Sequence, residues 1–71
     1  MAQRVWIATR CGHRIEGQVR DLVPGGTEFW ILVDGVPDAW NRKTTRVEAL
    51  RFAEIARQQL ETKGWRTVVY L

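Results

Sequence analysis

Hydrophobic and polar residues alternate along much of the chain, and this pattern predicts β-strands because successive strand side chains point to opposite faces of a sheet. The alternation covers residues 3–10, 15–23 and 28–34. Turn-forming sequences separate these segments, with glycine at 12 and Pro-Gly-Gly at 24–26. Three strands joined by short turns predict an antiparallel meander.

A fourth strand is expected beyond Asp34-Gly35, because this dipeptide favours a two-residue hairpin turn. The strand would cover residues 36–41, and Pro37 predicts that it lies at a sheet edge, since proline has no N–H to donate. The segment before the turn is apolar on both faces, with Trp30 and Leu32 on one of them. Such a strand is typically covered on both sides, or meets a partner with its second face.

The second half of the chain predicts one helix and a closing strand. Thr45 and Glu48 have the spacing of a capping box, and the apolar residues that follow recur with helical period. Gly64 is expected to end the helix in a left-handed conformation. Residues 65–71 alternate again. The sequence therefore predicts a single α+β domain over residues 1–71, ordered β-β-β-(β)-α-β, with the helix packed on one face of the sheet.

Counting alternate positions assigns the strand residues to two faces. One face is aliphatic and suits the helix; it comprises Val5, Ile7, Ile15, Val19, Phe29, Ile31, Val33 and Val69. The other face mixes aromatic rings with arginine; it comprises Trp6, Gln18, Arg20, Trp30, Leu32, Arg66 and Tyr70. One helix covers only one face of a sheet, so the second face is expected to point outward. A bulge in any strand would reverse this assignment beyond it.

Composition and charge favour a binding protein over an enzyme. The 71 residues carry 11 basic and 8 acidic side chains, a net charge of +3, and nine of the basic residues are arginine. Arginine suits anionic or protein partners because its planar fork binds phosphate and carboxylate. A chain of this length has few residues to spare for a closed pocket. Without an apolar run or leader-like segment, the sequence predicts a cytoplasmic protein with no membrane partner.

Candidate catalytic and metal-binding residues are few. Cys11 and His13 are the only cysteine and histidine, whereas a structural zinc site needs four ligands. Cys11 and His13 also lie only two residues apart in a predicted turn, which is poor geometry for a nucleophile and its base. The sequence therefore predicts no catalytic residue, no cofactor and no metal.

The approach to the helix is basic, with Arg42, Lys43 and Arg46 flanking two threonines. A helix N-terminus carries partial positive charge and free N–H groups, so phosphate would be favoured there. The alternative interpretation is a solvated, charged loop, because the capping box already uses some of these donors.

The second half of the chain resembles a known family. It contains Phe29-Trp30-Ile31-Leu32-Val33-Asp34-Gly35, then Trp40-Asn41-Arg42-Lys43-Thr44-Thr45, then Glu48-Ala49-Leu50. An aromatic strand, a tight turn, a basic strand and a threonine-capped helix are similar to the arm-DNA-binding domains of phage tyrosine integrases. The resemblance implies a sheet that enters the DNA major groove, with Trp30, Trp40, Arg42 and Lys43 on it. The closing strand and the Pro37-Asp38 pair depart from that family.

Two functions remain open on the sequence alone, both for a small non-catalytic protein of bacterial or phage type. The first is DNA or RNA binding, with phosphate contacts and stacking from Arg20, Trp30, Trp40, Arg42, Lys43, Arg46 and Arg66. The second is a protein-interaction module or homodimer that buries the aromatic sheet face through Trp6, Trp30, Leu32 and Tyr70. An amphipathic sheet with no partner is the structural alternative to both.

Overall fold

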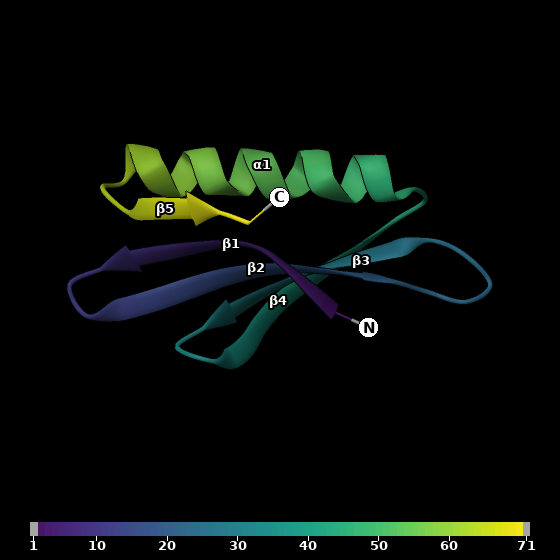
Figure 1. Cartoon of the computed structure of the whole chain (residues 1–71), viewed down its shortest axis with the longest axis horizontal. Coiled ribbons are helices and arrows are strands. Elements are labelled where there is room, and N and C mark those ends of the chain that lie inside the picture. Colours follow the sequence, from purple (N-terminus) through teal and green to yellow (C-terminus); the bar gives the residue numbers. More distant parts are fainter. Residues whose placement is uncertain (1, 71) are drawn as a thin grey trace.

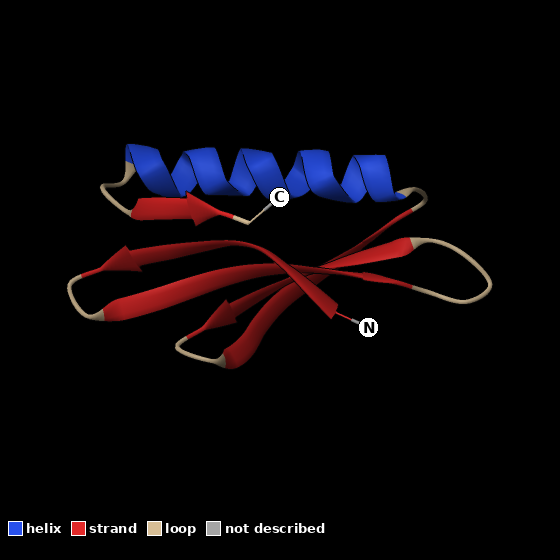
Figure 2. Cartoon of the chain, in the orientation of Figure 1, coloured by secondary structure: helices blue, strands red, loops and turns tan. Residues whose placement is uncertain are grey.

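The computed structural model describes residues 2–70 as one five-stranded antiparallel sheet and one helix, which confirms the predicted α+β fold (Figures 1 and 2). The elements are β1 (Ala2–Arg10), β2 (His13–Asp21), β3 (Thr27–Val33), β4 (Val36–Lys43), α1 (Arg46–Thr62) and β5 (Arg66–Val69).

The strands lie in the order β4-β3-β2-β1-β5. The first four strands form the expected meander, and β4, which contains Pro37, lies at one edge as predicted. After α1 the chain returns to the opposite edge, where β5 pairs with β1. The helix lies across one face of the twisted sheet, and we call the other face the outer face (Figure 1).

Asp34-Gly35 forms the two-residue hairpin turn that its sequence predicts, and Cys11-Gly12, in the predicted turn around Gly12, forms a second one. Cys11 and Gly12 have φ angles of 50° and 79°, and Asp34 and Gly35 have 51° and 84°. Positive φ at both central residues matches the right-handed twist of the flanking strands. The Asp34 carboxylate also accepts a hydrogen bond from the Arg14 backbone N–H at 2.8 Å, which ties the second turn to β2.

The helix ends are those expected from the sequence. Thr45 is the N-cap, and its hydroxyl accepts a hydrogen bond from the Glu48 N–H at 3.2 Å. At the other end Gly64 has φ 92°, and the Trp65 N–H donates to the Leu60 carbonyl at 3.1 Å. This left-handed exit turns the chain back toward the sheet and lets β5 pair with β1.

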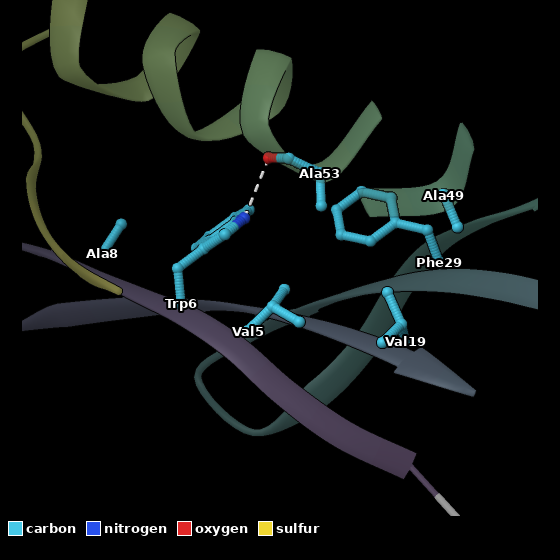
Figure 3. Close-up of a cluster of buried hydrophobic side chains, with 7 residues drawn as sticks. All are labelled: Val5, Trp6, Ala8, Val19, Phe29, Ala49 and Ala53. Carbon is cyan, nitrogen blue, oxygen red and sulfur yellow. Dashed lines mark hydrogen bonds between the residues drawn. The ribbon is translucent and has the colours of Figure 1, made fainter. Parts of the chain in front are cut away.

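The core lies between α1 and the sheet, and it corrects the assignment of Trp6. A register shift between Arg4 and Trp6 makes Val5 an extra residue in β1, so that Val5 and Trp6 both point toward the helix. Trp6 is 1% exposed, and its indole N–H donates to the Ala53 carbonyl at 2.9 Å (Figure 3). The prediction that Trp6 faces outward is therefore wrong, because a bulge reverses the alternation.

The bulge also moves Ile7 to the outer face. Ile7 pairs with Glu16, which is an outer-face residue, whereas Ala8 takes its place among the buried side chains of the core. The buried hydrophobic residues are Val5, Trp6, Ala8, Val19, Phe29, Ala49 and Ala53 (Figure 3). Small alanines on α1, Ala49 and Ala53, let the helix approach the sheet closely.

Candidate nucleic-acid interface

Two tryptophans from neighbouring strands stack on the outer face. Trp30 of β3 pairs with Trp40 of β4 in the sheet register, and their ring centroids lie 5.9 Å apart with an angle of 22° between the planes. Trp30 is half-buried, whereas Trp40 is 57% exposed. The same cross-strand row continues through Gln18 of β2 to Arg4 of β1.

Arginines flank the stacked pair in the next cross-strand row. That row pairs Arg20 of β2 with Glu28 of β3, and Glu28 with Arg42 of β4. The Trp30 indole N–H donates to the Glu28 carboxylate at 3.2 Å, and Arg42 Nη2 lies 3.4 Å from the Gly25 carbonyl oxygen. We call these outer-face residues of the two rows the arginine–tryptophan face: Arg4, Gln18, Arg20, Glu28, Trp30, Trp40 and Arg42.

A shallow hollow of about 180 Å³ lies on this face. Its lining residues are Ala2, Gln18, Arg20, Trp30, Leu32 and Pro37. The hollow thus has aromatic and apolar surface beside a guanidinium and an amide. Such a surface can take a flat ring on the tryptophan side and hydrogen-bond it on the glutamine side.

A buried carboxylate anchors the middle of the outer face. Glu16 is 3% exposed, accepts hydrogen bonds from Arg4 and, at 3.0 Å, from Gln18, and lies 3.9 Å from Arg14 Nη2. Burial acts to raise the pKa of Glu16, but the hydrogen bonds from Arg4 and Gln18 and the nearby guanidinium charges outweigh it and hold the pKa below its usual value. Glu16 is therefore ionised at neutral pH and fixes the positions of Arg4 and Gln18.

Arg4 is a site residue that the sequence reasoning missed. Its guanidinium pairs with Glu16 and also lies 5.7 Å from the centroid of the Tyr70 ring. The alternation pattern did not include Arg4 among the outer-face residues. Its partners depend on register, since Glu16 is on β2 and Tyr70 follows β5, and no local sequence signal indicates those contacts.

Lys43 and Arg46 do not lie on the outer face. The register places Lys43 on the helix side, where its Nζ lies 4.6 Å from the centroid of the Phe52 ring. Arg46 Nη1 is 3.1 Å from the Asp21 carboxylate, whose pKa is lowered by the Thr27 hydroxyl and by Arg46. Lys43 thus lies on the sheet, in β4, as the integrase resemblance implied, but its side chain is on the face opposite to Trp30, because adjacent strand residues point to opposite faces.

Arg66 lies apart from the other predicted residues. It is on the outer side of β5 and pairs with Thr9 near the β1–β2 turn, whereas Arg20 and Arg42 lie at the other end of the sheet. The structure therefore brings together Arg20, Trp30, Trp40 and Arg42 of the predicted nucleic-acid set and separates Lys43, Arg46 and Arg66 from them.

The predicted protein interface is not a continuous apolar surface. Leu32 and Tyr70 are on the outer face as expected, but Trp6 is in the core. Between Trp30 on β3 and Tyr70 beyond β5 lie the polar side chains of β2 and β1, including Gln18 and Arg4. Dry burial of this face would desolvate charged groups along with the rings.

Comparison with known proteins adds no relative: no family model, no curated protein and no solved structure matches the chain. The resemblance to integrase arm-binding domains accordingly stays a prediction. Among residues 2–70 there is no cluster of three or more His, Cys, Asp or Glu side chains suited to a metal ion. That part of the chain also contains no helix with the length and hydrophobicity of a membrane span.

Proposed function

We propose that the protein binds nucleic acid on the arginine–tryptophan face, with bases stacked on the Trp30–Trp40 pair and phosphates held by Arg20 and Arg42. Single-stranded segments suit this surface best, because a base must be unstacked from its neighbours to lie against a protein ring. The proposal concerns binding alone and assigns no reaction to the chain.

The observation that carries the proposal is the stacked tryptophan pair flanked by two arginines, Arg20 and Arg42, that form no ion pair within the described residues although Glu28 lies between them in the register. Within residues 2–70, neither Arg20 nor Arg42 forms an ion pair, whereas Arg4, Arg46 and Arg57 do. An unpaired guanidinium beside an exposed ring supports phosphate binding and stacking at one place. Trp40, at the edge of the sheet, leaves one side of the stack accessible.

The polar centre of the outer face favours a polar ligand over the homodimer alternative. Gln18 and the Arg4–Glu16 pair interrupt the aromatic surface, and these groups keep hydrogen-bonding capacity that bases and sugars can use. A dry protein interface would instead need the apolar side chains to be contiguous. Lys43 and Arg46 are not part of the proposed site, because both contact the helix side of the molecule.

The test is a fluorescence anisotropy titration with labelled single-stranded RNA, single-stranded DNA and duplex DNA of mixed sequence, at low and moderate salt. We expect saturable binding, tighter for the single strands, that weakens as salt rises. Trp40→Ala should weaken binding about 10-fold, since one stacked base contributes about 1–3 kcal/mol.

The matched control is Ile55→Ala, which removes a half-exposed apolar side chain from α1 on the other side of the molecule. Equal losses in the two variants, or no binding by the unmodified protein at low salt, would contradict the proposal. A mass that doubles with concentration, and that Trp30→Ala returns to one chain, would support the homodimer in its place.

A further inference from the structure

The sheet has one long exposed edge strand, β4. All of its residues except Lys43 are exposed, and no other strand pairs with its outer edge in the part of the chain that the structure describes. The opposite edge, β5, has only four residues, against eight in β4. An unpaired edge offers backbone N–H and C=O groups to another strand.

An apolar groove runs beside this edge on the helix side. It has a volume of about 140 Å³ and is lined by Phe29, Ile31, Ala39, Trp40, Asn41 and Phe52. Phe52 also lines an adjoining hollow of about 200 Å³, with Lys43, Arg51 and Ile55. The groove exists because Ala39 and Asn41 are the side chains that β4 directs toward α1, and neither is large enough to fill the space.

We propose that a partner protein binds here with an extended, acidic segment that adds to β4 as a sixth strand. Alternate apolar side chains of the segment would enter the groove between β4 and Phe52, while its backbone pairs with β4. This mode of recognition combines main-chain hydrogen bonds with pockets for every second side chain. The site lies on the helix side and at the sheet edge; of the residues that line the groove, only Trp40 also belongs to the arginine–tryptophan face.

Charge decides the chemistry of the partner. Lys43 and Arg51 border the hollow that adjoins the groove, and within the described residues neither forms an ion pair. Glu48, the acid in that hollow, accepts a hydrogen bond from the Thr45 hydroxyl in the capping box. Opposite charges across neighbouring strands stabilise pairing, so Asp or Glu is expected opposite Lys43.

The same charges disfavour a second copy of this chain as the occupant. Residues 39–43 carry Arg42 and Lys43 and no acid, so two copies paired along this stretch would gather four cations and provide no carboxylate opposite Lys43. Pro37 lacks an N–H, and the register shift at Leu32 leaves Asp38 as an extra residue. The added strand is therefore confined to residues 39–43.

The experiment is selection from a displayed library of random peptides on the full chain, with counter-selection on Ala39→Arg, which fills the groove. We expect the enriched peptides to have apolar residues at alternate positions and Asp or Glu at one end. Asn41→Arg is the second groove-filling variant, and circular dichroism establishes that each variant is folded. In the variant with Lys43→Glu and Arg51→Glu, the enriched acids should give way to Lys or Arg, whereas Arg66→Glu should leave the selection unchanged.

Three outcomes would overturn the proposal. One is that no enriched sequence distinguishes the unmodified chain from the groove-filling variants. Another is that the enriched peptides still contain Asp or Glu when the charges of Lys43 and Arg51 are reversed in the double variant. The third is a concentration-dependent mass that Ala39→Arg abolishes, because a second copy would then occupy the edge. Nucleic acid is absent from all these measurements, so their failure is separable from failure of the proposed function.

Discussion

The indole of Trp6 lies directly over Gly17, its cross-strand partner in β2. A Cβ atom on Gly17 would lie 2.5 Å from Trp6 Cε2 and 2.9 Å from Trp6 Nε1. The ring can move away from Gly17 only by breaking the hydrogen bond from its N–H to the Ala53 carbonyl. The bulge at Val5, the bare backbone of Gly17 and the close approach of α1 thus form one packing arrangement.

Gly17→Ala should lower the free energy of unfolding by about 1–3 kcal/mol, the usual cost of overpacking a core. The added methyl would have to displace the Trp6 ring and break its hydrogen bond to α1. Urea denaturation followed by circular dichroism measures the loss. The matched control is Gly25→Ala, since a Cβ there meets nothing within 4 Å, and a change within about 0.5 kcal/mol is expected. Equal effects at both positions would show that the Trp6–Gly17 contact is not tight.

Glu16→Gln should destabilise the protein at neutral pH by about 1–2 kcal/mol, because the Gln side chain loses the charge-assisted hydrogen bonds from Arg4 and Gln18. The folded-state pKa of Glu16 lies below the unfolded value. The ionised group therefore contributes its full stabilisation above the unfolded pKa, and this contribution is lost as the pH falls through the folded pKa.

The measurement is the urea midpoint of the unmodified protein and of the Glu16→Gln variant, taken from neutral pH down to about pH 3. The usual Glu pKa of about 4.3 serves as the unfolded-state value. We expect the difference between them to be constant near neutrality and to shrink at the acidic end. A difference in midpoint between the two proteins that grows as the pH falls would mean that burial raises the Glu16 pKa and that Arg4 and Arg14 do not compensate for the burial.

Replacing Arg20 and Arg42 together with alanine should reduce the slope of log affinity against log salt for single-stranded nucleic acid. Two phosphate contacts correspond to a change of about 1–2 units. Anisotropy titrations at several salt concentrations give the slope. The control variant carries Arg51→Ala and Arg66→Ala, which remove the same charge from positions away from the arginine–tryptophan face. If the control variant shows the same reduction in slope, binding depends on net charge alone and not on the arginine–tryptophan face.

Thr45→Ala should cost about 1 kcal/mol of stability, because the Glu48 N–H at the first turn of α1 loses its acceptor. Thermal or urea unfolding measures the effect. Thr44→Ala is the neighbouring control, since within the described chain the Thr44 hydroxyl makes no hydrogen bond to a protein group. If the two variants unfold alike, the cap does not limit the stability of α1.

The sequence by itself determined the local features of this protein. Alternating hydrophobic and polar residues located the strands. Gly12 and Gly35, which adopt positive φ, marked the hairpin turns, and Thr45 and Gly64 marked the helix ends. Each of these features depends on residues close together in the chain, so their physical causes are visible in the sequence. The edge position of β4 followed in the same way from Pro37.

Only the tertiary structure decided which residues share a surface. The extra residue at Val5 buries Trp6 under α1, the strand register joins Arg4 to Glu16 and Trp30 to Trp40, and Lys43 turns to the helix side. Bulges and register are selected by how well side chains from distant segments pack together. A tryptophan that alternation assigned to a binding surface therefore became the centre of the core, because Gly17 and Ala53 left space for it there.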